Sequence, residues 1–261
     1  MVIDSHCHLH DPTFAALHET LRVSLAHDVW GAVAVGCDPE TNAKTLSAAA
    51  AAPKAVWACL GFHPDWTQLT DEDLEKVEAQ VSRHHGRIVG IGEIGLPWYS
   101  LAGAADAATL MARGRARLDR LLGLAAHWDL PVALHAPHAA AVRALEALRA
   151  HGIERAVFHW HKAPDDVTRA IVEAGYFVSV TPEVVYRDRD RELVTRVPLD
   201  SLLVESDGPW KYRGEFEGMD SGPWFASRVA EEVAKLKQMP VDDVMHQLST
   251  NACRLFDLVW H

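Results

Sequence analysis

The sequence has few cysteines, and they lie far apart. Cys7, Cys37, Cys59 and Cys253 are the only four in 261 residues, and none of them forms a Cys-x-x-Cys pair. This spacing argues against a cysteine-based zinc ribbon and against a disulfide scaffold. It favours a reducing compartment, and we expect the protein to be cytoplasmic.

Long apolar runs and excess positive charge are also absent. No apolar run approaches the roughly 20 residues of a membrane helix, and no basic segment precedes the first apolar residues, so we expect neither a membrane span nor a signal peptide. The 25 Lys and Arg residues are outnumbered by 36 Asp and Glu, which gives a net charge of −11. A basic nucleic-acid footprint is therefore missing at the level of the whole chain.

Short apolar runs instead alternate with helical patterns along the whole chain. We expect eight strands, at 2–9, 30–37, 55–62, 88–96, 131–136, 155–160, 176–181 and 202–206. Helical periodicity is clear at 71–85, 107–128, 138–152 and 163–175, and Gly152 and Gly175 are typical C-terminal caps. Eight such repeats predict an α/β fold of the (β/α)8 barrel type, in one domain spanning 1–261. No Gly-x-Gly-x-x-Gly follows the first strand, which disfavours an open dinucleotide-binding sheet.

The first expected strand ends in a pair of histidines. In "IDSHCHLHD", His6 and His8 are one residue apart. The two-residue period of a strand points both imidazoles to one side and Cys7 to the other, where we expect it in the core. A polar strand end would explain the pair, but two histidines on the same side fit a metal ion better.

Further polar residues follow the other strands at the same end. These are His63 in "GFHPD", Glu93 in "IGEIGL", His135 in "VALHAP", His159 in "VFHWH" and Asp207 in "LVESDGPW". Each alone could be a packed histidine or a turn-forming aspartate. Together they would converge on one barrel mouth, where buried ionisable groups are costly unless they are paired or bind metal. The set therefore predicts a metal site.

The number of ligands indicates two ions. Four histidines and two carboxylates, His6, His8, His135, His159, Glu93 and Asp207, exceed the needs of one tetrahedral zinc ion. Two ions about 3.5–4 Å apart can stabilise an attacking and a leaving oxygen. Glu93 is the candidate bridge, and a mixed His and carboxylate set accepts Mg²⁺, Mn²⁺ or Zn²⁺. No Ser-His-Asp or Cys-His nucleophile pattern competes with this interpretation.

Seven segments resemble, in order, the motifs of the TatD family of metal-dependent hydrolases. They are "DSHCHLH", "GFHP", "IGEIGL", "LHAP", "FHW", "ESDGPW" and "STNACRLFDL", and they span nearly the whole chain. The resemblance implies a distorted (β/α)8 barrel of the amidohydrolase superfamily. It also implies a divalent-metal-dependent deoxyribonuclease that trims single strands of DNA from the 3′ end.

The resemblance assigns roles residue by residue. His6, His8 and Asp207 would bind the first ion, Glu93 would bridge, and His135 and His159 would bind the second. Asp207 would also accept the proton of the attacking water. Glu205 would orient a metal ligand, and His63 would face the substrate phosphate.

The departures from the family pattern lie on the substrate side. The usual arginine after the fifth-strand histidine is missing in "LHAPH", where His138 is the candidate replacement. Pro97-Trp98 stands where the family has Asp-Tyr, Trp160-His161-Lys162 replaces a small Ser/Gly-rich stretch, and "WKYRGEFEGMD" adds Lys211 and Arg213. The candidate substrate contacts are therefore His63, His138, His161, Lys162, Lys211 and Arg213.

Two alternatives to the deoxyribonuclease stay open. One is an amidohydrolase-type enzyme acting on a small ester, amide or phosphotriester. Many such enzymes bridge their metals through a modified lysine on the fourth strand, and no lysine lies near Glu93. The other is a non-catalytic metal-binding partner, against which the retention of every ligand argues. We expect single-stranded DNA ends as substrate, two bound cations that offset the acidic chain locally, and a monomer.

Overall fold

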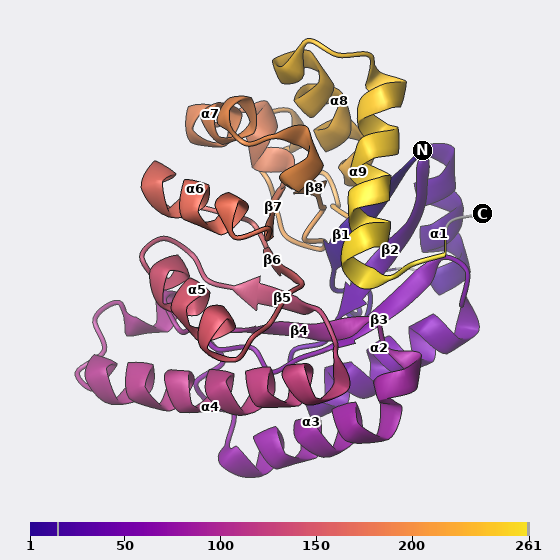
Figure 1. The fold of residues 1–261 in the computed structure, drawn as a ribbon. Coiled ribbons are helices and arrows are strands. Elements are labelled where there is room, and N and C mark those ends of the chain that lie inside the picture. Colours follow the sequence, from indigo (N-terminus) through magenta and orange to yellow (C-terminus); the bar gives the residue numbers. More distant parts are fainter. Residues whose placement is uncertain (15, 260–261) are drawn as a thin grey trace.

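The computed structural model describes residues 1–14 and 16–259. Its eight strands are all parallel to their neighbours and lie in chain order, as Figure 1 shows. They are β1 Val2–Cys7, β2 Val29–Val35, β3 Val56–Leu60, β4 Gly90–Gly95, β5 Val132–His135, β6 Ala156–Phe158, β7 Phe177–Val180 and β8 Leu202–Val204. The predicted barrel and all eight strands are confirmed.

The strands end sooner than the sequence pattern suggested. β1 stops at Cys7 rather than at residue 9, and β6 stops at Phe158 rather than at residue 160. His8 and His159 therefore lie just beyond their strands, as do His63 and Asp207. The apolar pattern runs on past the hydrogen-bonded ladder because the loops at this end are also buried.

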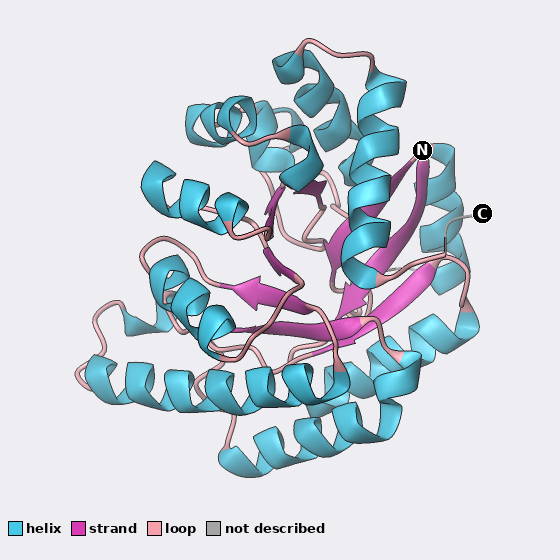
Figure 2. Ribbon diagram, in the orientation of Figure 1, coloured by secondary structure: helices cyan, strands magenta, loops and turns pink. Residues whose placement is uncertain are grey.

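Nine helices lie among the described residues, and they surround the strands (Figure 2). They are α1 Leu17–Ala26, α2 Pro39–Ala51, α3 Asp71–His84, α4 Ala107–Trp128, α5 Ala140–Ala150, α6 Asp165–Glu173, α7 Asp188–Arg196, α8 Phe225–Lys237 and α9 Val241–Phe256. The 3₁₀ turns are η1 His85–Arg87, η2 Tyr99–Leu101, η3 Pro182–Val185, η4 Leu199–Ser201 and η5 Gly214–Phe216. In the described part of the chain, none of these helices has the length and apolar character needed to cross a bilayer.

Local sequence signals fix several helix ends. Thr70 and Asp73 form a reciprocal capping box at the start of α3, and Asp38 and Thr41 do the same for α2. The predicted glycine caps are confirmed: Gly152 and Gly175 follow α5 and α6 with φ of +65° and +86°. Glycine adopts this left-handed conformation without the steric cost of a Cβ atom.

The barrel is nearly closed between β1 and β8. Among the described residues these two strands share no regular ladder, and side chains tie them instead. The Asp4 carboxylate accepts hydrogen bonds from the Ser206 hydroxyl and backbone N–H at 2.6 and 3.0 Å. Beyond the strands, the N–H of Asp207 donates to the His6 carbonyl at 3.0 Å. Polar bonds thus hold His6 and Asp207 side by side.

An apolar cluster fills the opposite end of the barrel. Ile3, Ala133, Val157, Phe177 and Leu203 come from the first or second positions of five strands and pack with Leu255 and Phe256 of α9. Only the interior can bring so many strands around one cluster. Burial there supplies about 25 cal/mol for each Å² of apolar surface. The strand starts therefore carry stability, and the carboxyl ends of the strands are left for polar residues.

Candidate metal centre

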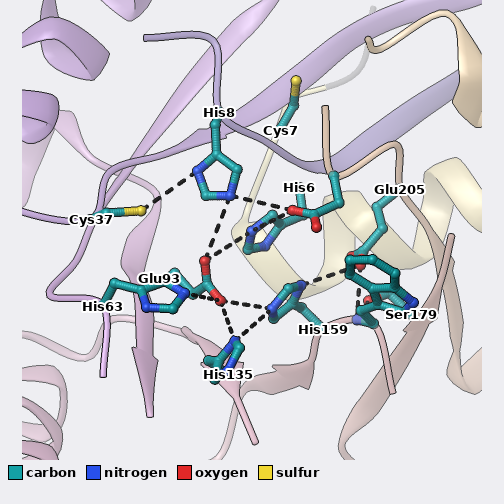
Figure 3. A network of polar contacts seen from close by, with 12 residues as sticks. His6, Cys7, His8, Cys37, His63, Glu93, His135, His159, Ser179 and Glu205 are labelled. Carbon is teal, nitrogen blue, oxygen red and sulfur yellow. Dashed lines mark hydrogen bonds and ion pairs between the residues drawn. The ribbon is translucent and has the colours of Figure 1, made fainter. Parts of the chain in front are cut away.

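Glu93 stands at the centre of the polar cluster at the strand ends (Figure 3). The ladder register shifts between Ile91 and Ile94 on β4, which brackets Glu93, and between Asp4 and Cys7 on β1, which brackets His6. Such irregularities re-aim side chains. Gly61 allows the close approach of β3, because a Cβ there would lie 2.1 Å from the Glu93 backbone nitrogen.

The two carboxylate oxygens of Glu93 face different histidines. Oε2 lies 3.5 Å from His6 Nε2 and 3.7 Å from His8 Nε2. Oε1 lies 2.7 Å from both His135 Nδ1 and His159 Nε2. One side chain therefore joins two groups of histidines, which Figure 3 shows on either side of it.

Asp207 completes the first group. Its Oδ1 lies 3.3 Å from His8 Nε2 and 3.7 Å from His6 Nε2. The backbone of Asp207 has a φ of +44°, in the left-handed region that non-glycine residues rarely adopt. Strained backbone of this kind clusters at functional sites, where the surrounding structure holds it in place.

The unpaired atoms of the cluster fit a cation. Both ring nitrogens of His6 and Oδ1 of Asp207 are buried without a hydrogen-bond partner, which is costly for polar atoms. Two donors bound at about 2.1 Å to one tetrahedral ion lie about 3.4 Å apart. The separations around His6, His8 and Asp207 are 3.3 to 3.7 Å, so this donor set suits a divalent ion.

Three of the four histidines have a second partner at the ring nitrogen that faces away from Glu93. His159 Nδ1 lies 3.3 Å from Glu205 Oε1, and His135 Nε2 lies 3.0 Å from Asp65 Oδ2. His8 Nδ1 lies 3.6 Å from the Cys37 sulfur. Such partners fix the tautomer and the orientation of a metal-binding imidazole.

Electrostatics keep the carboxylates ionised. Burial by itself raises the pKa of Glu93, but the charges of His159 and His63 and hydrogen bonds from His135 and His159 outweigh it and hold that pKa well below its usual range. Burial also raises the pKa of Asp207, but the hydrogen bond from His8 and the charges of His8 and His6 outweigh it, so that pKa is lowered. The Glu93 charge and the Glu205 hydrogen bond overcome burial and raise the pKa of His159 to about 10. A cation bound here therefore displaces a proton from His159.

The cluster forms the floor of a cavity of about 840 Å³, a size typical of small-ligand sites. Three predicted substrate residues line it: His63, Lys162 and Lys211. His63 Nε2 lies 3.4 Å from Glu93 Oε1, close enough to share a ligand position with His135. Lys162 Nζ lies 3.6 Å from the centre of the Trp160 ring, whereas Lys211 is exposed and paired with Asp220.

The other three predicted substrate residues are not brought to the cavity. His161 is buried and does not line the cavity, and its Nε2 lies 2.8 Å from Thr168 Oγ1. His138 is half-buried against Trp98, with ring centres 5.4 Å apart. Arg213 is exposed and does not line the cavity. Alternation along a loop is not fixed as it is in a strand, so sequence spacing could not place these side chains.

The sequence reasoning also missed several cavity residues, among them Asp65 and Arg187. Asp65 follows "GFHP" and also accepts hydrogen bonds from the backbone N–H groups of Trp98 and Ser100. Its position two residues after His63 is a signal that could have found it. Arg187 lies after β7, a strand end with no predicted site residue, and its Nε is 2.6 Å from Glu183 Oε1.

The comparisons with known proteins agree over the length of the chain. The family model described as TatD related DNase matches residues 3–257. A metal-dependent hydrolase of Haemophilus influenzae is 30% identical, over 99% of this chain and 100% of that protein. Deoxyribonuclease TATDN3 of Homo sapiens is 29% identical, over 100% of this chain and 96% of that protein. The crystal structure of YjjV, a TatD homologue from Escherichia coli K12, has a TM-score of 0.88 at 28% identity, covering 99% and 98% of the two chains.

Proposed function

Because the chain belongs to the TatD-related DNases, a family of metal-dependent hydrolases, we propose that it cleaves phosphodiester bonds of DNA with two divalent ions. The favoured substrate is a single strand, trimmed from its 3′ end. We propose further that it acts as a cytoplasmic monomer, in keeping with its four free cysteines.

The proposal rests on the position of Glu93, whose two carboxylate oxygens face different groups of metal-binding side chains. His6, His8 and Asp207 would hold one ion beside Oε2, and His135 and His159 would hold the other beside Oε1. Ions in such a pair stabilise charge on the phosphoryl group and make water a stronger nucleophile. A carboxylate placed between two histidine groups can hold two ions this close together.

Asp207 is the proton acceptor in the proposed reaction. Its Oδ1 has no hydrogen-bond partner, and its pKa is lowered by His8 and His6 against the effect of burial. The carboxylate is thus ionised and free to take the proton of the attacking water as the water oxygen bonds to phosphorus. The P–O bond on the opposite side breaks, and its oxygen leaves with a proton from solvent.

The cavity wall offers groups suited to an unpaired strand. Lys162 and Arg187 place two cations beside the floor, where charge-assisted bonds to phosphate oxygens are stronger than neutral ones. Tyr99 and Trp210 line the same cavity and are 51% and 56% exposed. Exposed aromatic rings stack on bases that are not paired, which supports a single-stranded substrate.

The test is a metal-dependent cleavage screen. The protein, loaded with Mg²⁺, Mn²⁺ or Zn²⁺, is given single- and double-stranded DNA labelled at either end, beside an ester, an amide and a phosphotriester. We expect release of mononucleotides from the 3′ end of single strands. The matched controls are Glu93→Gln, which should abolish release, and Arg213→Ala, which should not change it. Hydrolysis of the ester, amide or phosphotriester without DNA cleavage would overturn the proposal.

A separate measurement tests the number of ions. Elemental analysis of protein purified without a chelator should find up to two divalent ions per chain. Absence of any bound or titratable ion in the parent protein would contradict the two-ion arrangement. This readout does not depend on the substrate.

A further inference from the structure

His8 has an unusual partner behind it. The outer partners of His159 and His135 are the carboxylates of Glu205 and Asp65, but the outer partner of His8 is the thiol of Cys37. A carboxylate in this place orients the ring of a metal-binding histidine. A cysteine sulfur is itself a strong ligand for thiophilic cations such as Zn²⁺ and Cd²⁺.

A third group of ligand atoms surrounds this thiol. Cys37 Sγ, one nitrogen of His8 and one of His10 all lie within 4.8 Å of one another. His10 Nδ1 is buried without a hydrogen-bond partner, and the ring contacts the Val35 carbonyl instead. If the other nitrogen donates to that carbonyl, Nδ1 carries a lone pair.

The geometry of the pair with His8 suits one ion. A thiolate at about 2.3 Å and an imidazole at about 2.0 Å from a tetrahedral zinc ion lie about 3.5 Å apart. The observed separation of Cys37 Sγ and His8 Nδ1 is 3.6 Å. Cys37 is held in place because its backbone N–H donates to Thr41 Oγ1 at 2.8 Å, at the capped start of α2.

The group formed by His8, His10 and Cys37 is open to the cavity. His8, His10 and Cys37 all line it, so a cation can reach them by the same route as the ions of the main centre. Cys7 and Cys59 are fully buried and line no part of that cavity. Figure 3 shows His8 between Cys37 and Glu93, with one ring nitrogen toward each.

We propose that Cys37, His10 and His8 Nδ1 form a separate site for one thiophilic cation, and that this site competes with the main centre for His8. A neutral imidazole has one lone pair. When Nε2 of His8 binds an ion, Nδ1 carries the proton and donates it toward the Cys37 sulfur. When Nδ1 binds a thiophilic ion, the ring proton moves to Nε2, where Asp207 Oδ1 at 3.3 Å accepts the hydrogen bond, and the Cys37 thiol proton goes to solvent.

The consequence is a built-in response to thiophilic metals. A cation captured by Cys37 removes His8 from the set that holds the first ion of the main centre. Loading of the third group therefore weakens binding at the main centre, whatever bond the enzyme cleaves. This inference goes beyond the proposed function and does not depend on its substrate.

The test is a titration of the full-length, Mn²⁺-loaded protein with Cd²⁺. Two signals are followed in one sample: the ultraviolet thiolate-to-cadmium absorption and the electron paramagnetic resonance of released Mn²⁺. We expect both to rise together in the parent protein, with a single cadmium–thiolate site per chain. Absence of the absorption band in the parent, or a band without Mn²⁺ release, would overturn the proposal.

Variants assign the ligands. Cys37→Ser should lose the band, and Mn²⁺ release should then need at least about tenfold more Cd²⁺, since lost ligand partners typically weaken metal binding by about 10–100-fold. His10→Ala should shift both curves by about tenfold. Cys253→Ser, which removes a partly exposed thiol on α9, should match the parent.

The alternatives give different results. A band that survives Cys37→Ser, or a His10→Ala curve that overlies the parent, would show that this site is not formed by these residues. Because Cys37 is buried, thermal unfolding of each variant is checked first, and Cys37→Ala replaces Cys37→Ser if the serine variant does not fold.

Discussion

The floor and the rim of the cavity are built differently. The floor consists of His8, Glu93, His135, His159 and Asp207, and His6 lies against Glu93 and Asp207 without lining the cavity. The rim consists of Tyr99, Lys162, Arg187, Trp210 and Lys211. Floor residues contact one another, and all but the half-buried His8 are buried, with Glu93 1% exposed. Rim residues reach into solvent and pair with local partners, as Lys211 does with Asp220.

The difference indicates a division of labour. The floor comes from strand ends and their adjoining turns, whose backbone is held by the sheet. In enzymes, preorganised polar groups stabilise the charge that develops in the transition state. The rim comes from the longer loops that follow the strands, which tolerate substitution and usually decide what is bound. We therefore expect floor variants to change turnover and rim variants to change substrate affinity.

The largest effect is expected for Glu93→Gln. The amide keeps the shape of the side chain but removes the charge that joins the two donor groups. Loss of several kcal/mol of charge stabilisation corresponds to a fall in kcat/KM of about 10³-fold or more. Elemental analysis should show lower occupancy of both ions. Normal metal content with normal turnover would remove Glu93 from the centre of the floor.

Asp207→Asn should have the next largest effect. If Asp207 takes the proton of the attacking water, kcat should fall by about 10²-fold or more, while KM changes little. Steady-state kinetics on the substrate identified in the cleavage screen separate the two constants. If KM rises while kcat is unchanged, Asp207 contributes to substrate binding, as the rim residues do, and does not accept the proton.

Rim variants should have smaller effects, of a different kind. Lys162→Ala and Arg187→Ala should leave metal content intact and raise KM for DNA by about tenfold each, since a hydrogen bond to a charged group contributes about 1.5 kcal/mol or more. Each should also reduce the slope of log affinity against log salt by about one.

Arg213→Ala is the matched control for these two. It removes a positive charge two residues after the cavity-lining Lys211, but from a residue that does not itself line the cavity. Equal salt slopes for all three variants would show that the rim cations act only through overall charge.

The smallest effect on activity is expected for His161→Gln, which acts on stability instead. Burial, with a contribution from Arg189, lowers the pKa of His161 from 6.5 to about 3. Between about pH 6.5 and pH 3, His161 is therefore protonated in the unfolded chain but neutral in the folded chain. His161 thus makes the free energy of unfolding fall as pH drops from 6.5 toward 3, by up to about 1.4 kcal/mol per pH unit.

Urea unfolding at about pH 7 and about pH 5 measures this dependence. His161→Gln should flatten it, whatever its effect at neutral pH, and exposed His18→Gln should not. If His161→Gln changes DNA cleavage at neutral pH, His161 contacts the substrate, as the sequence analysis predicted.

The sequence was informative about the floor because strand geometry is regular. Period-two alternation placed His6 and His8 on one side and Cys7 on the other, and Cys7 is indeed buried in the core. Glu93 and His135 lie within their strands, so the parallel arrangement alone brings their side chains to one end of the barrel.

The rim could not be read in the same way, because loops have no fixed period. His161 and Lys162 are neighbours in the sequence, yet one is buried against Thr168 and the other lies over Trp160 in the cavity. Arg187 follows β7, at whose end the sequence predicted no site residue, so nothing in its surroundings pointed to the site. The roles of all these residues stay predictions until the variants are measured.

By itself, the sequence determined the eight alternating repeats, the helix caps and the set of ionisable residues at the strand ends, because each depends on local periodicity or on the cost of burying charge. Only the tertiary structure decided which partner stands behind each histidine. Asp65, Glu205 and Cys37 reach His135, His159 and His8 from other strand ends. Those contacts join residues between 29 and 70 positions apart, a separation that only closure of the barrel brings within hydrogen-bonding distance.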